Sequence, residues 1–382
     1  MKILINTISA KRNAGGAFQI SLNFIKYSLS WGDADIEWYY LVSNDIDNQL
    51  RKDGCQINTR YFALPTQPNI HTYFKVRKEI RKIEEQIKPD IVYSITAPSY
   101  FTFKSKEVMR FTNPWVSHPN AFSWNILSTK EKIKMKLYIL IQKFLIKKAK
   151  YFVTQTELVK TNLIKMLKLP QDNIKVVPNV LPAAFLVESR EHIGYNDNKI
   201  HIACIANSSK HKNLDIIPSI LRHLRDKYQT TNAVFHLTLP LESSIWKNIQ
   251  EQTAQLGLMD NVITHGRVDQ KELANIYRHC DIAFIPTLLE VFSASGVEAA
   301  YFNLPIIATD FDFNREVFKD NCSYYKPTNS EDAANKIFEL INYIDTHHKE
   351  ISYSNDLIIS QYGNYDKHFR GICDFLVETY KK

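Results

Sequence analysis

Short apolar runs alternate with longer amphipathic stretches along the first half of the chain. The apolar runs predict strands near residues 2–6, 37–43, 58–62, 90–94, 107–112, 151–154 and 174–177. Between them, apolar residues that recur every three or four positions predict helices near 16–31, 70–88, 128–149 and 156–168. Strands that alternate with helices are typical of doubly wound parallel sheets, so we expect a Rossmann-like α/β domain.

The same alternation resumes in the second half, after a stretch that lacks it. Strands are predicted near 199–206, 233–239, 261–264, 282–285, 305–308 and 322–325. The stretch before them carries two prolines and no periodic pattern, which indicates a linker. We therefore expect one Rossmann-like domain at 1–180, a linker at 181–198, a second Rossmann-like domain at 199–350, and C-terminal helices at 351–382 that return to the first domain.

Composition indicates a globular protein, with 45% hydrophobic and 23% charged residues. No apolar run approaches the roughly 20 residues of a membrane span, and the N-terminus enters a strand pattern without a signal-peptide core. We therefore expect a cytoplasmic protein. The five cysteines are scattered and lack Cys-x-x-Cys spacing, which argues against a disulfide framework or a zinc site.

A net charge of +8 favours anionic partners: nucleotide phosphates, nucleic acid or a lipid surface. The densest basic stretch, 128–150, begins with the capping box of Ser128 and Glu131. One face of the predicted helix carries four apolar residues, and the opposite face carries lysines: Ile133, Leu137, Leu140 and Phe144 against Lys132, Lys136, Lys143, Lys147 and Lys150. Two interpretations stay open, a crossover helix packed on a sheet or a surface that also rests on anionic lipid. Lysines spread over both halves without a recognised module, so we expect no nucleic-acid partner.

Glycines follow the first predicted strand of the chain. Gly15 and Gly16 stand where the next helix begins, so the backbone N–H groups there could approach an anion closely. The same pair of residues is also common in ordinary turns. The sequence is not the Gly-x-Gly-x-x-Gly pattern of dinucleotide sites, so both interpretations, phosphate contact and an ordinary turn, stay open.

The second half has a lysine and two glutamates near strand ends. Lys212 follows the first strand of this half, at the start of a helix, where a cation suits a departing diphosphate. Glu290 is expected in the loop after the strand at 282–285, and Glu298 about two turns into the next helix. The spacing predicts that both carboxylates address the same ligand.

These residues lie in stretches that resemble a known family. Residues 266–290 and 298–310, with Lys212 and Asn213, look like the donor-binding domain of retaining glycosyltransferases of family 4. The stretches 151–157 and 176–179 resemble the end of that family's acceptor domain. The resemblance implies the GT-B fold: two facing Rossmann-like α/β domains with an interdomain cleft.

The resemblance also implies roles for these residues. Glu298 would hold the nucleotide ribose, Glu290 would contact the transferred sugar near its reacting carbon, and Lys212 would neutralise the leaving diphosphate in place of a metal ion. Backbone amides at the helix start would cradle the sugar and phosphates, from Phe292, Ser293, Ala294 and Ser295.

The chain departs from the family pattern at several of these positions. Asn207 stands where the family usually has arginine, so a fixed cation is lost, and Arg267 or Lys210 could compensate. Ser293 and Ser295 replace the usual glycine and proline. In the acceptor domain the family has a histidine after the fifth strand; this chain has Asn113 at that offset and His118 five residues later, so both are candidates for contact with the donor sugar.

One further motif competes with this interpretation. Asp310 and Asp312 follow an apolar strand as an Asp-x-Asp pair, which can share a divalent cation. Because the resembled family also has a loop aspartate at this place, we expect no metal site there.

The leading hypothesis is a retaining, metal-independent glycosyltransferase. It would move a sugar from a nucleoside-diphosphate sugar to a carbohydrate acceptor, lipid-linked, in the synthesis of a bacterial surface polysaccharide such as O-antigen, capsule or lipopolysaccharide. The protein would be cytoplasmic, or bound peripherally to the inner face of the plasma membrane. A sugar-nucleotide epimerase on the same fold and a non-catalytic basic binding protein are the alternatives.

Overall fold

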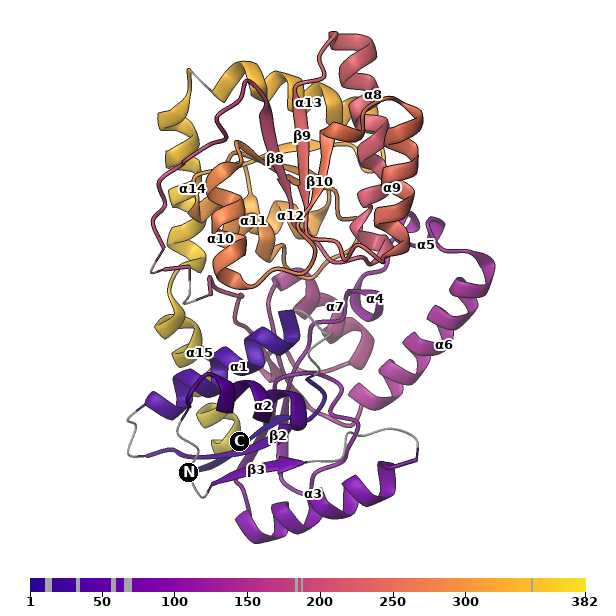
Figure 1. The fold of residues 1–382 in the computed structure, drawn as a ribbon. Coiled ribbons are helices and arrows are strands. Elements are labelled where there is room, and N and C mark those ends of the chain that lie inside the picture. Colours follow the sequence, from indigo (N-terminus) through magenta and orange to yellow (C-terminus); the bar gives the residue numbers. More distant parts are fainter. Residues whose placement is uncertain are drawn as a thin grey trace. The chain divides into compact units, whose positions relative to one another are not determined.

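The computed structural model divides the chain into two compact units, each built on one parallel sheet (Figure 1). It describes residues 1–10, 16–31, 35–55, 60–64, 71–182, 185–186, 188–344 and 346–382. The first unit comprises 1–118, 133–178 and 366–382, and the second comprises 119–132 and 179–365. The chain therefore passes from one unit to the other more than once.

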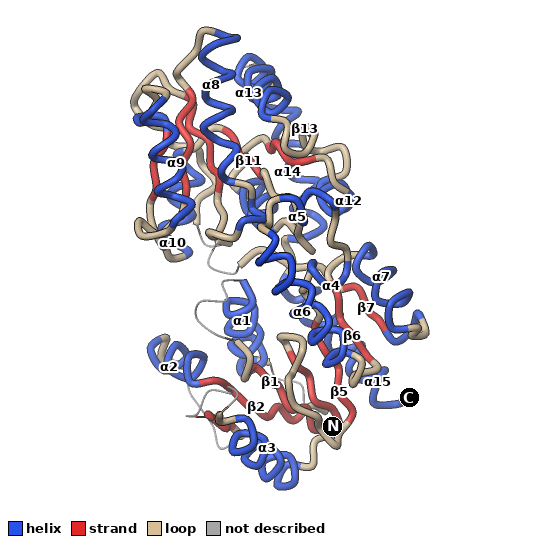
Figure 2. The backbone as a smooth tube through the Cα atoms, turned by 90° about the vertical axis from the view of Figure 1, so that its right-hand side faces the viewer, coloured by secondary structure: helices blue, strands red, loops and turns tan. Residues whose placement is uncertain are grey.

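The first unit contains a seven-stranded parallel sheet in the order β3-β2-β1-β4-β5-β6-β7 (Figure 2). Its strands are β1 (Lys2–Thr7), β2 (Glu37–Ser43), β3 (Tyr61–Leu64), β4 (Ile91–Ser94), β5 (Lys106–Arg110), β6 (Tyr151–Thr154) and β7 (Ile174–Val176). The helices of this part of the chain are α1 (Gly16–Ser30), α2 (Asn44–Lys52), α3 (Tyr73–Ile87), α4 (Pro114–Ser117), α6 (Thr129–Ile146), α7 (Glu157–Leu167) and α15 (Tyr365–Lys381).

Apolar side chains of the sheet's central strands pack against α3. Leu4, Leu41 and Val92 form one buried cluster with Val76 and Ile80 of that helix. The central strands are buried on both faces, which explains why their sequences are apolar runs and do not alternate with polar residues.

The second unit contains a six-stranded parallel sheet in the order β10-β9-β8-β11-β12-β13. Its strands are β8 (Ile200–Cys204), β9 (Ala233–Leu237), β10 (Val262–Thr264), β11 (Ile282–Ile285), β12 (Ile306–Thr309) and β13 (Ser323–Tyr325). Its helices are α5 (Ala121–Asn125), α8 (Ile217–Tyr228), α9 (Ser244–Gln255), α10 (Gln270–His279), α11 (Ala294–Tyr301), α12 (Asp312–Phe318), α13 (Ser330–Ile344) and α14 (His348–Tyr362).

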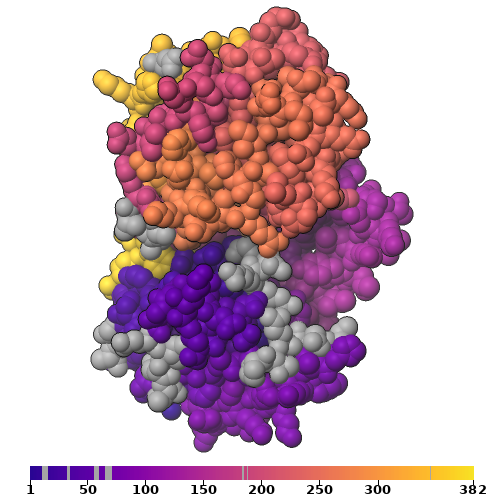
Figure 3. All heavy atoms as spheres, viewed as in Figure 1, coloured from indigo at the N-terminus to yellow at the C-terminus, as the bar shows by residue number. Residues whose placement is uncertain are grey.

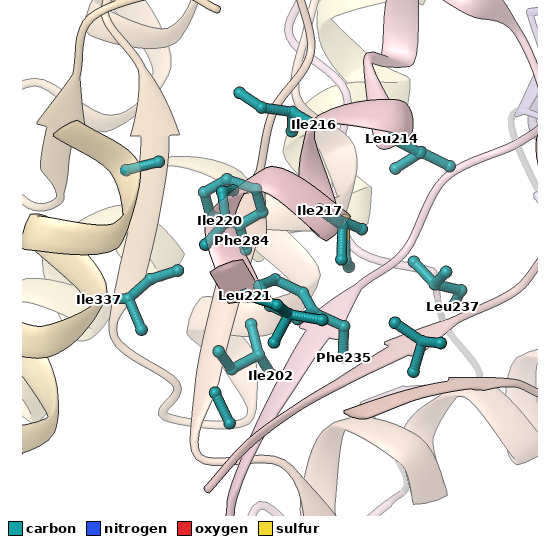
Figure 4. Packing of buried hydrophobic residues seen from close by; sticks show 14 of the residues in the cluster. Ile202, Leu214, Ile216, Ile217, Ile220, Leu221, Phe235, Leu237, Phe284 and Ile337 are labelled. Carbon is teal, nitrogen blue, oxygen red and sulfur yellow. The ribbon is translucent and has the colours of Figure 1, made fainter. Parts of the chain in front are cut away.

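The core of the second unit lies between its sheet and two helices (Figure 4). Ile202 and Phe284 project from neighbouring strands toward Ile220 and Leu221 of α8, and Ile337 of α13 joins the same cluster. Burial of this apolar surface is the main favourable contribution to the folding of the unit. It fixes the sheet whose strand ends carry the candidate site.

The two predicted parallel-sheet α/β domains are confirmed, and most predicted strands lie within about two residues of the observed ones. The third strand is the exception: it was expected at 58–62 and is found at Tyr61–Leu64, with 56–59 outside the described residues. Helix α2 was not predicted. It is short and mostly charged, and it buries only Ile46 and Leu50, so its periodic signal is weak.

The predicted capping box at the start of α6 is present. The backbone N–H of Ser128 donates to a carboxylate oxygen of Glu131 at 2.8 Å, and the Ser128 hydroxyl accepts from the Glu131 N–H at 3.4 Å. Across the described ranges, no helix combines the length and apolarity needed to span a bilayer.

Candidate functional site

The strand order of the second unit reverses between β8 and β11. β8 has β9 on one side and β11 on the other, so connections leave in opposite directions from these two neighbours. In open parallel sheets, this reversal leaves a crevice beyond the carboxyl ends of the two strands, and ligands bind there. Lys212 lies on the segment that follows β8, and Glu290 lies on the loop that follows β11.

The side chains of Lys212 and Glu290 meet beyond the carboxyl ends of β8 and β11. Lys212 Nζ lies 2.6 Å from Glu290 Oε1, and the two side chains are 13% and 21% exposed. Because both are largely removed from water, their attraction is screened less than that of a surface pair. The sequence predicted both residues as ligand-directed groups, and the structure brings their charges together.

Backbone contacts hold the two loops against each other. The N–H of Leu288 donates to the carbonyl of His211 at 2.8 Å, one residue before Lys212. The carbonyl of Leu288 accepts a 2.7 Å hydrogen bond from the side-chain amide of Asn120, which belongs to the same unit. The positions of the ammonium and carboxylate groups are therefore fixed by main-chain bonds as well as by their own attraction.

The two residues near the missing family arginine have local roles. Asn207 is exposed, and its side-chain oxygen accepts from the N–H of Ser209 at 3.0 Å, which closes a turn after β8. Lys210 forms an ion pair with Glu131 at 2.8 Å. The Lys210 ammonium is thus engaged by Glu131, and Lys212 is the cation that the structure places beside Glu290.

A buried polar network fixes the loop between β11 and α11. The Ser293 hydroxyl donates to the side-chain oxygen of Asn314 at 2.5 Å, and the Asn314 amide donates to the carbonyl of Thr309 at 2.9 Å. The Thr309 hydroxyl donates to the carbonyl of Thr287 at 2.6 Å. All four side chains are buried. Ser293, the departure from the family glycine, therefore anchors this loop to β12 and α12.

The other residues at the start of α11 also have defined contacts. The Phe292 ring is buried and packs edge-on against Tyr362, with ring centroids 5.1 Å apart. The N–H of Ala294 donates to the Phe292 carbonyl at 2.9 Å, so this amide of the predicted cradle is already engaged. Ser295 accepts a hydrogen bond at its carbonyl from Tyr277 at 3.2 Å.

Close packing brings α11 against β11 and α12 at Gly296. A Cβ atom at this position would lie 2.7 Å from Cδ1 of Ile285 and would collide with the ring of Phe318. Only glycine fits without a shift of the neighbouring side chains. The glycine thereby sets how near Glu298, two residues later, lies to the strand end.

Glu298 lies in a polar contact that the sequence did not reveal. The hydroxyl of Tyr277, on α10, donates to Glu298 Oε2 at 3.1 Å. The pKa of Glu298 is raised to about 7, mainly by burial. The charge of Glu290 also raises this pKa, and the hydrogen bond from Tyr277 partly offsets the rise. The two carboxylates are therefore near enough for the charge of one to act on the other.

Three residues of this site escaped the sequence analysis: Asn120, Tyr277 and Asn314. Tyr277 falls on the buried side of an amphipathic helix, where it reads as a core residue. Asn120 and Asn314 are distant in sequence from the residues that they contact. For Asn120, the sequence offers one indication, the capping box that it forms with Ser123 at the start of α5.

The remaining predicted residues belong to the first unit. Asn113 caps the start of α4, and its side-chain amide donates to the Tyr138 hydroxyl at 3.0 Å. His118 ends the same helix, with Nδ1 2.7 Å from the Ser117 hydroxyl oxygen. Gly16 begins α1, and space is open where its Cβ would be. Gly15 lies outside the described residues.

The first carboxylate of the competing Asp-x-Asp motif pairs with an arginine. Asp310 forms a two-pronged ion pair with Arg315, with Nε–Oδ1 at 2.5 Å and Nη2–Oδ2 at 2.8 Å. Among the residues that the structure describes, no group of three or more histidine, cysteine, aspartate or glutamate side chains is arranged to hold a metal ion.

Comparisons with known proteins identify similar sequences and folds. The model of the family described as glycosyl transferases group 1 matches residues 187–355. An uncharacterized 41.2 kDa protein in the cps region of Klebsiella pneumoniae is 27% identical over 235 residues, which cover 59% of this chain and 59% of that protein. The chain thus spans about three-fifths of the length of this curated relative.

Solved structures match over nearly the whole chain. A glycosyltransferase from Rickettsia africae ESF-5 gives a TM-score of 0.72 at 16% identity, covering 100% of this chain and 98% of that one. Anabaena Alr3699/HepE in complex with UDP-glucose gives a TM-score of 0.72 at 16% identity, covering 99% and 100%. At this identity the structural likeness establishes the fold, two parallel-sheet α/β domains as in GT-B glycosyltransferases. The sequence match to the group 1 model lies within the second unit, and the solved structures add the likeness in fold.

Proposed function

We propose that this protein transfers a sugar from a nucleoside-diphosphate sugar to a hydroxyl group of a carbohydrate acceptor, with retention at the anomeric carbon and without a metal ion. The observation that carries the proposal is the pair of Lys212 and Glu290, joined at 2.6 Å where the strand order of the second unit reverses. A cation and a carboxylate in contact at this edge suit a ligand that carries both phosphate and sugar hydroxyl groups.

In this proposal Lys212 binds the diphosphate of the donor. Negative charge grows on the leaving diphosphate as the glycosidic bond breaks, and the ammonium, already fixed by its loop contacts, stabilises that charge. Glu290 accepts hydrogen bonds from the sugar and stabilises positive charge that develops at the reacting carbon. The acceptor hydroxyl attacks from the side of the leaving group, and its proton passes to a phosphate oxygen.

Glu298 binds the ribose in the same scheme. A carboxylate can accept hydrogen bonds from both ribose hydroxyls, and the Tyr277 hydroxyl holds one of its oxygens in place. The backbone N–H groups of Phe292, Ser293 and Ser295 contact the sugar and phosphates, while that of Ala294 stays bonded to the Phe292 carbonyl, on a loop that the buried network keeps rigid. Asn207 lies in the turn at the same strand end.

The comparisons guide the choice of substrates. A structural neighbour binds UDP-glucose, so uridine diphosphate sugars are the first donors to test. The relative in a cps region favours an acceptor from capsule synthesis, and O-antigen and lipopolysaccharide acceptors are related candidates. We propose a lipid-linked acceptor, used at the cytoplasmic face of the membrane. Contacts of Gly16, Asn113 and His118 with the donor are part of the proposal.

Turnover assays with and without acceptor test the reaction class. The protein is incubated with each of a panel of nucleotide sugars, in buffer containing EDTA, and the nucleotide and sugar products are separated. Release of nucleoside diphosphate that requires an acceptor, with a new α-linked product from an α-linked donor, is the expected result. Conversion of one nucleotide sugar into its epimer without acceptor would instead identify an epimerase.

A further inference from the structure

Helix α6 packs on the first unit through one face and presents a second apolar face to solvent. Its inward side is made of buried and half-buried residues at helical spacing: Met135, Ile139, Gln142 and Ile146. At about 100° per residue, the outward stripe lies about 180° around the helix from these residues. The sequence left open whether this helix packs on a sheet or rests on anionic lipid, and the structure buries the face opposite to the predicted apolar one.

The outward stripe consists of large apolar side chains at spacings of three or four residues. Ile133 is 66% exposed, Leu137 59%, Leu140 65% and Phe144 68%. Figure 3 shows atoms of this segment, in magenta, on the molecular surface. The helices of globular proteins normally turn such a stripe inward, so a contiguous row that faces water marks an interaction surface.

Lysines border the stripe, whereas the sequence pattern had been expected to place them on the opposite face of the helix. Lys136 and Lys143 follow one side of it, Lys134 follows the other, and Lys147 and Lys148 lie beyond its C-terminal end. Lys148 Nζ lies 5.7 Å from the centre of the Phe144 ring. From Lys132 to Thr156 the chain contains no acidic residue. From Lys132 onward, α6 itself therefore carries only positive charges.

We propose that α6 docks the protein on an anionic lipid surface. The helix would lie in the plane of the membrane interface, with the stripe from Ile133 to Phe144 among the acyl chains and the lysines at the level of the phosphates. Bordering cations fit a headgroup layer of negative charge, which surrounds an inserted helix on both sides. A protein partner would need an apolar groove with acidic side chains along both edges. An anionic bilayer offers acyl chains beneath a negatively charged headgroup layer over its whole surface.

The docking helix also touches a candidate residue of the reaction. Tyr138, one position after Leu137, accepts the hydrogen bond from the side chain of Asn113. Membrane docking through α6 would hold Asn113 close to the lipid surface, where a lipid-linked acceptor resides. This benefit rests on the proposed function, but docking itself does not, because lipid binding can be measured without any substrate.

Vesicle flotation tests the inference on the full-length protein. The probes are vesicles of phosphatidylcholine alone and of an equal mixture of phosphatidylcholine and phosphatidylglycerol. We expect binding to the mixed vesicles at low salt, and weaker binding to neutral vesicles and at high salt, because ions screen the attraction of the lysines. Absence of binding to the mixed vesicles at low salt would overturn the inference.

Matched variants distinguish vesicle binding through the stripe from non-specific hydrophobic adsorption. The triple variant Ile133→Gln, Leu140→Gln, Phe144→Gln changes only exposed side chains, and we expect it to lower the vesicle partition coefficient by at least about tenfold. Leu241→Gln, at a side chain 67% exposed in the second unit, should leave partition unchanged. Equal loss in both variants would contradict a specific role for α6.

A second pair of variants tests the charges. Lys134→Gln, Lys136→Gln, Lys147→Gln should lower partition into the mixed vesicles on the order of a hundredfold at low salt. Removal of three exposed lysines from α3, by Lys75→Gln, Lys78→Gln, Lys82→Gln, should change it much less. Equal effects would show that net charge alone drives binding and would overturn the inference.

Light scattering without lipid tests a second copy of the chain as the occupant. The inference predicts the same mass for the wild type and the apolar triple variant. A wild-type dimer that becomes a monomer in the triple variant would assign the stripe to self-association instead. Nucleotide binding by the triple variant, measured in parallel, should equal that of the wild type, which confirms that it is folded.

Discussion

Lys212 Nζ and Glu290 Oε1 lie 2.6 Å apart, and each belongs to a loop that follows one of two adjacent parallel strands. The strand order of the sheet reverses between those strands. This largely buried pair is held by contacts between the two loops, including the 2.7 Å bond from Asn120 to the Leu288 carbonyl. The charges are therefore preorganised before a donor arrives.

We predict that Lys212→Ala lowers kcat by about 100-fold to 1,000-fold. The ammonium acts on charge that develops during bond cleavage, and loss of such a group from a preorganised site typically costs this much. Steady-state kinetics with the preferred donor and acceptor measure the effect. Lys210→Ala is the matched control, because Lys210 is close in sequence but pairs with Glu131. Similar losses in the two variants would show that general positive charge, and not the contact with Glu290, matters.

We predict that affinity for the nucleoside diphosphate rises with pH through about 7. Burial raises the pKa of Glu298 to about 7, so the group is largely protonated in the free protein below this pH and ionised above it. Because the ribose hydroxyls donate to the ionised form, binding should weaken by about tenfold from pH 8 to pH 6. Calorimetric titrations at several pH values measure it. Glu298→Gln should bind weakly with a flat profile between these values; a profile like that of the wild type would exclude Glu298 as its origin.

Tyr277→Phe should move the midpoint of that profile to higher pH. The hydrogen bond from the Tyr277 hydroxyl lowers the pKa of Glu298, so its removal lets burial raise the pKa further. The same titrations detect the shift. A purely structural role for Tyr277 would lower stability and leave the midpoint unchanged.

Gly296→Ala should destabilise the second unit by about 1–3 kcal/mol. The added methyl group meets Ile285 and Phe318 in a packed interior, and overpacking usually costs this much. Gly371→Ala, in the middle of α15, is the control: its nearest neighbour is a Val177 methyl at 3.8 Å, and alanine should be neutral or stabilising by up to about 1 kcal/mol. Denaturant titrations compare the two, and equal stability of both variants would contradict the packing argument.

Acid should destabilise the second unit through a line of buried histidines. His236 lies between His201 and His265, with nitrogen distances of 2.8 Å and 2.9 Å. The pKa of His236 is lowered to about 3, mainly by burial and to a smaller extent by the charges of His265 and His201. In the unfolded chain, His236 binds a proton near a pH of about 6.5, whereas in the folded chain it stays neutral at that pH. The free energy of unfolding is therefore highest above about pH 6.5 and falls as the pH drops toward the pKa of the folded state.

Unfolding midpoints between about pH 7 and about pH 5 measure this dependence. His236→Gln should reduce the slope of the midpoint against pH, whatever its effect on stability at neutral pH. The exposed His348→Gln should leave the slope unchanged. An unaltered slope in His236→Gln would assign the acid sensitivity to other groups.

The sequence predicted the features that depend on residues close together along the chain. Strand positions follow from short apolar runs, and the placement of Lys212, Glu290 and Glu298 follows from their offsets to strand ends. Tyr277 and Asn314 could not be predicted, because their roles depend on contacts between segments that only folding brings together. The sequence marked Ser293 as a departure from the family pattern without showing its role, and the structure shows its hydroxyl bonded to Asn314.

The buried side of helix α6 could not be predicted from the sequence. It is apolar on two opposite sides, so periodicity identifies a helix without telling which side is buried. The inward side even includes a polar residue, Gln142, whose amide donates to the Tyr100 hydroxyl at 3.3 Å. Only the packing of the first unit decides that Ile139 and Ile146 face inward while Leu140 and Phe144 face solvent.

The central claim, a nucleoside-diphosphate site at Lys212, Glu290 and Glu298, is tested most directly by calorimetric titration in buffer containing EDTA. Uridine, guanosine, adenosine and thymidine diphosphates are titrated into the wild type, Lys212→Ala and Lys210→Ala at a pH of about 8, where Glu298 is ionised. The account predicts that at least one of them binds the wild type and Lys210→Ala equally, and binds Lys212→Ala at least about tenfold more weakly. Failure of all four to bind the wild type, or equal affinity for the two variants, would contradict it.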